Sequence, residues 1–242
     1  MTRRNTLLIV ASAILLAGFG WSFYATRTAV AEPLTLRFHA FVGDQPLVLN
    51  EMRYNNPGGE GRYKIRDFQL FISNIQLSGP SKSHTAKDSY HLLRFDGESA
   101  YAEITLPALD IDDFDEIHWG IGIDPKANGS LVIAGDLDPN NRMAWNWKVG
   151  YKFILLEGRL DTGQNLVPLV YHVGFDENYT PQSLPIVNSK AGQQGTVLNY
   201  KIDINALFAG PPPLDMAAVP TVKFDPDDTQ LIAQGFKGLI TN

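Results

Sequence analysis

Apolar residues recur at every second position in seven segments of this chain, and this period of two constrains its fold more than any other feature. In LTLRFHAFV, residues 34–42, the apolar side chains fall on one face, while Arg37 and His39 fall on the other. Runs of the same kind, separated by Pro, Gly, Asn and Asp, occupy residues 65–77, 101–107, 115–124, 143–155, 166–175 and 196–204. Such alternation is typical of half-buried β-strands.

These runs, with little helix between them, predict an antiparallel β-sandwich or barrel. The fold class that we expect is all-β, an antiparallel Greek-key-like β-sandwich with a short C-terminal helix. Asp227 or Asp228 is the expected cap of that helix, in TQLIAQGFKGLI, and NALFAG is expected to form a short turn. No linker interrupts residues 32–242, so we expect one domain there.

The first 31 residues have the pattern of a secretory signal peptide. Arg3 and Arg4 precede the apolar run TLLIVASAILLAGFGWSFYA, and Ala29-Val30-Ala31 is a small-x-small cleavage site. The apolar run, at about 20 residues, also allows an uncleaved membrane anchor. We expect cleavage, which would release residues 32–242 into the periplasm without a membrane attachment.

The composition of the mature chain excludes some classes of partner and of chemistry. The signal peptide holds three of the 20 basic residues and none of the 26 acidic ones, so 17 basic residues remain against 26 acidic, a net charge of −9. This balance argues against nucleic acid, which needs a basic face. The chain has no cysteine, which excludes disulfides, thiolate catalysis and iron–sulfur clusters.

The segment MAWNWKVGYKF, residues 143–153, places two of the four tryptophans one residue apart. Its alternation predicts one long strand, with the odd-numbered residues facing the core and Lys148 and Lys152 facing water. On this interpretation the aromatic side chains stabilise the core. The alternative interpretation is a functional site.

Two histidines are the best candidates for chemistry. Motifs for serine hydrolases, phosphate binding, dinucleotide binding and zinc peptidases are absent, so we expect a binding protein and not an enzyme. His39 and His172 each lie within a predicted strand, on the face opposite the main apolar set. A single histidine of this kind is typical of a hydrogen-bonded surface residue. If the two strands meet, their imidazoles suit copper or zinc, and a methionine nearby, Met143, favours copper.

Five segments in order resemble the MbnP-like proteins, relatives of which are described as metallo-mystery pair proteins. The segments are RFHAFVGDQPL, FQLFISNIQL, IHWGIGID, MAWNWKVGYKFILLEG and YHVG. The resemblance extends from about Leu34 to LIAQGF near the C-terminus, and its most specific element is M-x-W-x-W-x-x-G-Y-K-F. The four cysteines of one subgroup of the family are absent here.

The resemblance implies a periplasmic copper-binding β-sandwich whose site combines histidines with a kynurenine. The kynurenine would be made from a tryptophan by a di-haem c-type, peroxidase-like partner of the MbnH type. His39 and His172 match the family's histidine positions, and Trp145 or Trp147 is the expected modified residue, with Trp119 as the third choice. An indole N–H only donates, whereas the aryl amine of kynurenine can bind copper, expected as Cu(I).

Two other interpretations remain open. The first is a metal-free periplasmic binding module for a small ligand or a protein partner, in which His39 and His172 are surface residues. The second is a redox sink, a protein that exists to be oxidised by its di-haem partner. A gene for a di-haem cytochrome beside this one would support copper binding and the sink, but not the metal-free module.

Overall fold

The alternation predicted for the first strand is confirmed residue by residue. In β1 (Pro33–Val42), all five alternate apolar residues from Leu34 to Val42 are buried, whereas Arg37 and His39 are partly exposed. Successive side chains of a strand point to opposite faces. One face of β1 therefore belongs to the core and the other faces outward.

The computed structural model describes residues 33–97, 99, 101–130, 134–146, 150–187 and 196–242. The predicted signal peptide, residues 1–31, and Trp147 lie outside these described residues. Residues 31–242 form a single compact unit. In the described part of the chain, no helix is both long enough and apolar enough to cross a membrane.

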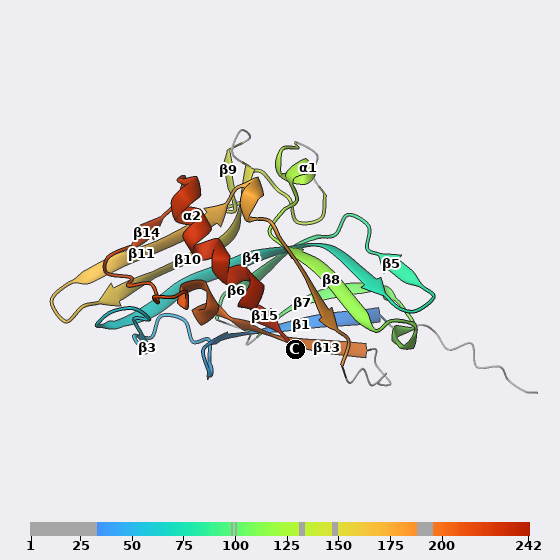
Figure 1. Cartoon of the computed structure of the whole chain (residues 1–242), viewed down its shortest axis with the longest axis horizontal. Coiled ribbons are helices and arrows are strands. Elements are labelled where there is room, and N and C mark those ends of the chain that lie inside the picture. Colours follow the sequence, from blue (N-terminus) through green and yellow to red (C-terminus); the bar gives the residue numbers. More distant parts are fainter. Residues whose placement is uncertain (1–32, 98, 100, 131–133, 147–149, 188–195) are drawn as a thin grey trace, which may run out of the picture. The chain divides into compact units, whose positions relative to one another are not determined.

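Among the described residues, five strands form the smaller sheet, sheet A. They run in the order β15-β13-β1-β2, and β7 also pairs with β1. Figure 1 labels all of these strands except β2. Apart from β1, its strands are β2 (Gln45–Pro46), β7 (Tyr101–Ala108), β13 (Thr196–Asp203) and β15 (Ile240–Thr241).

The larger sheet, sheet B, has the order β12-β8-β4-β10-β11-β14. The long central strand β4 also pairs with β3, β5 and β6, and β10 also pairs with β9. Its strands are β3 (Tyr54–Asn55), β4 (Arg62–Ser78), β5 (Ser83–Thr85), β6 (Tyr90–Phe95), β8 (Glu116–Ile121), β9 (Ala144–Asn146), β10 (Gly150–Asp161), β11 (Leu166–Gly174), β12 (Thr180–Pro185) and β14 (Thr221–Val222).

The predicted all-β sandwich is confirmed, with two parallel pairings in addition. β1 pairs in parallel with β13, and β11 pairs in parallel with β14. Parallel neighbours need a long connection. For β1 and β13 that connection contains all the described strands of sheet B except β14, and alternation within a strand does not reveal such a distant pairing.

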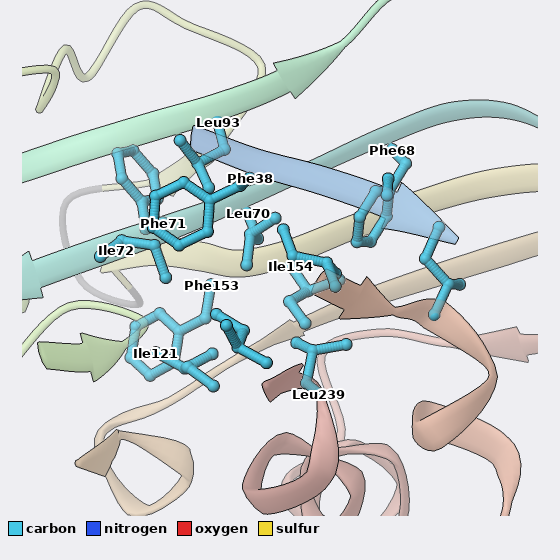
Figure 2. Packing of buried hydrophobic residues seen from close by; sticks show 14 of the residues in the cluster. Phe38, Phe68, Leu70, Phe71, Ile72, Leu93, Ile121, Phe153, Ile154 and Leu239 are labelled. Atoms are coloured by element: carbon cyan, nitrogen blue, oxygen red, sulfur yellow. The ribbon is translucent and has the colours of Figure 1, made fainter. Parts of the chain in front are cut away.

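The core lies between the inner faces of the two sheets. Phe38 of sheet A contacts Trp119 of β8 at 5.8 Å between ring centroids and belongs to the same cluster as Leu70 and Ile154 (Figure 2). Trp119 is 2% exposed, and its Nε1 donates to Gln182 Oε1 at 3.2 Å. This tryptophan is therefore a satisfied core residue.

Helices are short and connect or cover the sheets. The predicted turn at NALFAG is confirmed as the 3-10 helix η3. The C-terminal helix α2 begins earlier than predicted, because Asp225 caps it by accepting from the backbone N–H groups of Asp227 and Asp228, and Pro226 follows at the first helical position. The helices are η1 (Ile111–Asp113), α1 (Pro125–Asn128), η2 (Asp176–Asn178), η3 (Ile204–Phe208), α2 (Pro226–Ala233) and η4 (Gln234–Gly238).

The single strand predicted for residues 143–153 is wrong. β9 turns back on β10 as an antiparallel pair, with Asn146 opposite Gly150 and Ala144 opposite Tyr151. Gly150 has a φ of +86°, which favours glycine and accompanies the reversal. Lys152, predicted to face water, is only 9% exposed, and its ammonium donates to the backbone oxygen of Arg142.

His91 of β6 makes the stability of the fold depend on pH. Burial lowers the pKa of His91 below the ordinary 6.5, although Asp136 opposes the shift. Between the lowered value and 6.5, the unfolded chain binds a proton that the folded chain does not, so the free energy of unfolding decreases as the pH falls through this window.

We expect the His91→Gln variant to show a smaller decrease of unfolding free energy over the same window. Urea unfolding at pH values above and below 6.5 measures this difference. An identical pH dependence in the wild-type and variant proteins would contradict the prediction.

Candidate functional site

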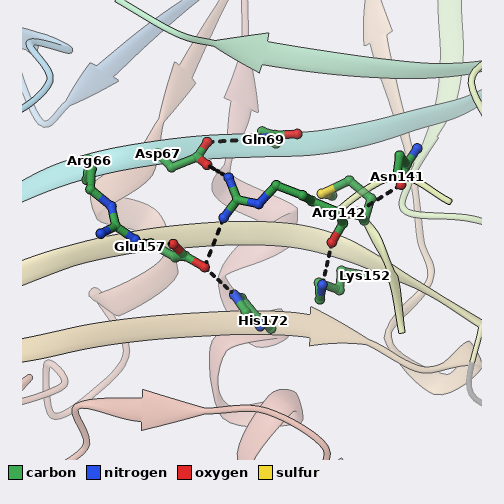
Figure 3. A network of polar contacts seen from close by, with 9 residues as sticks. Arg66, Asp67, Gln69, Asn141, Arg142, Lys152, Glu157 and His172 are labelled. Carbon is green, nitrogen blue, oxygen red and sulfur yellow. Dashed lines mark hydrogen bonds and ion pairs between the residues drawn. The ribbon is translucent and has the colours of Figure 1, made fainter. Parts of the chain in front are cut away.

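The outer face of sheet B carries a network of charged side chains centred on Glu157 of β10 (Figure 3). The carboxylate of Glu157 accepts from Arg66 Nη2 at 2.5 Å and from His172 Nε2 at 3.1 Å, and it lies 3.2 Å from Arg142 Nη2. The side chains of Glu157 and His172 are only 13% and 14% exposed. The contact between Glu157 and His172 is therefore largely shielded from solvent, whereas Arg66 and Arg142 are more than half exposed.

Arg142 connects the loop before β9 to this network. Its guanidinium pairs with Asp67 of β4 as well as with Glu157, and Gln69 Nε2 donates to Asp67 at 3.0 Å. The Arg142 backbone oxygen accepts from Lys152. These contacts join β4, β10 and the loop, so they fix the position of the chain that leads into Trp145.

The environment keeps Glu157 ionised and His172 neutral at neutral pH. Burial alone would raise the pKa of Glu157, but hydrogen bonds from Arg66 and His172 and the charge of Arg142 hold the pKa below its ordinary value. Burial lowers the pKa of His172, and the positive charges of Lys152 and Lys223 lower it further, against the opposing effect of Glu157.

The contact with Glu157 also determines the tautomer of His172. An ionised carboxylate only accepts, so Nε2 of the neutral imidazole must carry the proton. The lone pair then belongs to Nδ1, which has no hydrogen-bond partner among the described residues. A histidine that donates one ring nitrogen to a carboxylate is the usual form of a metal-ligating histidine.

Trp145 lies over the same face of β11. A Cβ built on Gly174 would be 2.7 Å from Trp145 Cζ3 and 2.9 Å from Cη2, so the six-membered ring covers this glycine. His172 and Gly174 are two residues apart in one strand and share a face. The structure therefore places two of the residues singled out in the sequence, Trp145 and His172, on the same face of β11.

Two phenylalanines with unusual backbone conformations flank Trp145. The ring centroids of Phe175 and Phe224 each lie 5.1 Å from that of Trp145. Phe175 has a φ of +70° and Phe224 a φ of +60°, a region that residues other than glycine rarely adopt. Such conformations cost roughly 1–3 kcal/mol each and cluster at functional sites. Both strained residues of this aromatic group contact the same indole.

The indole nitrogen of Trp145 is buried and has no hydrogen-bond partner. Buried N–H groups without a partner are rare, and each calls for a structural or chemical explanation. Trp119 differs because its Nε1 is bonded to Gln182. Trp147 lies outside the described residues.

His39 lies on the other sheet. It belongs to β1 and faces away from the core, with Nε2 3.2 Å from Asn199 Oδ1 and its ring 5.6 Å from that of Tyr101. Because the inner faces of the sheets enclose the core, outward-facing side chains of sheets A and B point apart. The structure places His39 and His172 on different sheets, so the prediction that both bind one copper ion is carried forward for His172 alone.

The comparisons with known proteins identify the family. The sequence model named MbnP matches residues 31–224, which is most of the chain. The chain belongs to the MbnP family. A solved structure, MbnP from Methylosinus trichosporium, is similar with a TM-score of 0.51 and 16% identity, over 74% of this chain and 78% of that one. At this identity the likeness shows the fold alone. A search of the curated proteins found no match.

For this MbnP-family chain, sequence reasoning did not find Glu157, Arg142 or Lys152 as parts of the site. The available signal was Glu157 itself, a lone acid after the apolar run FILL in β10. Among the described residues, no group of three or more histidine, cysteine, aspartate or glutamate side chains forms a metal cluster.

Proposed function

We propose that this MbnP-family protein is a periplasmic copper-binding protein and not an enzyme. His172 supplies an imidazole ligand through Nδ1, and a kynurenine derived from Trp145 supplies a second donor. The single observation that carries the proposal is the position of Trp145, on the same face of β11 as a histidine whose other nitrogen is held by a largely buried carboxylate. Membership of the family suggests a role in the methanobactin and copper system.

The donor chemistry of the described residues fits copper. A neutral imidazole is a good copper ligand, and Met143, a residue with a soft thioether, is fully buried in the loop that leads to Trp145. Copper bound at this site would be the ion that the protein carries, stores or removes. Lys152 and Lys223 place positive charge near His172, which opposes a divalent ion more strongly than a monovalent one and favours Cu(I).

The proposed modification accounts for the unpaired indole. Oxidative opening of the ring of Trp145, with loss of one carbon, converts the buried Nε1 without a partner into an aryl amine. A di-haem c-type, peroxidase-like partner of the MbnH type is the proposed catalyst, with peroxide as the oxidant, and hydrolysis of the formyl group that forms releases the lost carbon as formate. Phe224, 56% exposed and in contact with Trp145, brings this aromatic group to the surface.

The test is made on protein purified from its native periplasm, where the proposed partner is present. Trypsin cuts after Arg142 and Lys148, so both candidate tryptophans lie in the peptide MAWNWK. Tandem mass spectrometry assigns any exchange of one carbon for one oxygen to Trp145 or Trp147, and copper is measured on the same sample.

Kynurenine at position 145 together with stoichiometric copper would support the proposal. Two intact tryptophans without copper would overturn it in favour of the metal-free binding module. Kynurenine without copper would favour the redox sink instead.

A further inference from the structure

A cavity on sheet B has a chemistry that the copper proposal does not use. Its volume is about 250 Å³, and it lies between the neighbouring strands β4 and β6 and the loop before β9. The residues that line it are Gln69, Leu92, Arg94, Asn141, Arg142 and Met143. Two guanidinium groups and two carboxamides thus surround a small space.

Arg94 lines this cavity with a guanidinium group that has no partner among the described residues. It lies opposite Gln69 in the pairing of β6 with β4, and its side chain is exposed. Within the described part of the chain, Arg94 has no ion pair or hydrogen bond through its side chain, so all five of its N–H donors are available. Arg142, by contrast, already pairs with Asp67 and Glu157.

The acids near the cavity already have partners. Asp67 and Glu157 pair with Arg142, and the carboxylate of Asp136 accepts from the backbone N–H of Leu92. Arg94 is therefore the basic lining residue whose charge is left without an acidic partner among the described residues. An unpaired positive charge in a concave surface raises the local concentration of anions.

The walls of the cavity define the class of anion. A guanidinium fork binds carboxylate or phosphate through two parallel hydrogen bonds. Leu92, half-buried, adds apolar surface beside the arginines, whereas Met143 is fully buried and exposes none. An apolar wall suits the hydrocarbon part of an organic acid and makes no favourable contact with inorganic phosphate.

We propose that this cavity binds a small organic carboxylate, with Arg94 as its principal ligand. Asn141 is a second donor, because its amide nitrogen makes only a long contact of 3.5 Å to the backbone oxygen of Asp136. The proposal does not depend on copper binding or on any modification of Trp145.

Isothermal titration calorimetry of the purified mature chain with succinate tests the proposal, with inorganic phosphate as the comparison anion. We expect succinate to bind and the Arg94→Gln variant to bind it at least about tenfold more weakly. Arg159→Gln is the matched control, because Arg159 is also exposed, lies on sheet B outside the cavity and loses the same charge.

The site of binding is read from the methyl signals of methionine in an NMR titration. Succinate is expected to shift the signal of Met143, which lines the cavity, and to leave that of Met216, buried elsewhere, unchanged. Absence of succinate binding, equal losses in both arginine variants, or phosphate binding as tight as succinate would each overturn the proposal.

Discussion

Replacing His172 with alanine is expected to remove stoichiometric copper from protein that its oxidising partner has matured. The variant loses the imidazole whose Nδ1 lone pair is freed by the bond between Nε2 and Glu157. Loss of groups that only orient a ligand already weakens metal binding about 10–100-fold, so loss of the ligand itself is expected to cost about 100-fold or more. Competition with a Cu(I) chelator measures the affinity.

His39→Ala is the matched control for this experiment. His39 is also an outward-facing histidine in mid-strand, but it lies on sheet A beside Asn199. We expect this variant to retain its copper. Mass spectrometry of the peptide that contains Trp145 is needed for both variants, so that a failure of maturation is not mistaken for loss of a ligand. Copper lost from His39→Ala and kept by His172→Ala would contradict the assignment.

The sequence predicts most of the long strands, because burial on one face leaves a direct trace in the order of residues, but it did not predict β6 or β12. The alternation of β1 from Leu34 to Val42 appears unchanged in the structure. Alternation did not reveal the reversal at residues 143–153, because apolar residues can continue at every second position on both sides of a turn. Gly150, with its positive φ, was the only local sign of the reversal among the described residues.

The candidate site was predictable only in part. Trp145 and His172 were found from residue type and from the resemblance to the family, and the structure places them on one face. Their supporting network was not predictable, because Asp67 and Arg142 are 75 residues apart in sequence and meet only through the packing of the loop on sheet B. Local periodicity contains no information about such pairs.

Glu157→Gln is expected to weaken copper binding about 10–100-fold and to lower the free energy of unfolding by about 2 kcal/mol. The substitution keeps the shape of the side chain but removes the charge that Arg66 and Arg142 share, which costs stability because the carboxylate is largely buried. It also replaces an obligatory acceptor with an amide that can donate, so the tautomer of His172 is no longer fixed.

Asp67→Asn separates these two effects. Asp67 pairs with Arg142, as Glu157 does, and its side chain is 18% exposed, but no hydrogen bond or ion pair joins it to His172. Urea unfolding is expected to show that both variants are destabilised, whereas Cu(I) competition is expected to show weaker binding only for Glu157→Gln. Equal affinity losses in the two variants would mean that the network acts through the position of the loop. An unchanged affinity in Glu157→Gln would mean that the carboxylate does not orient a copper ligand at all.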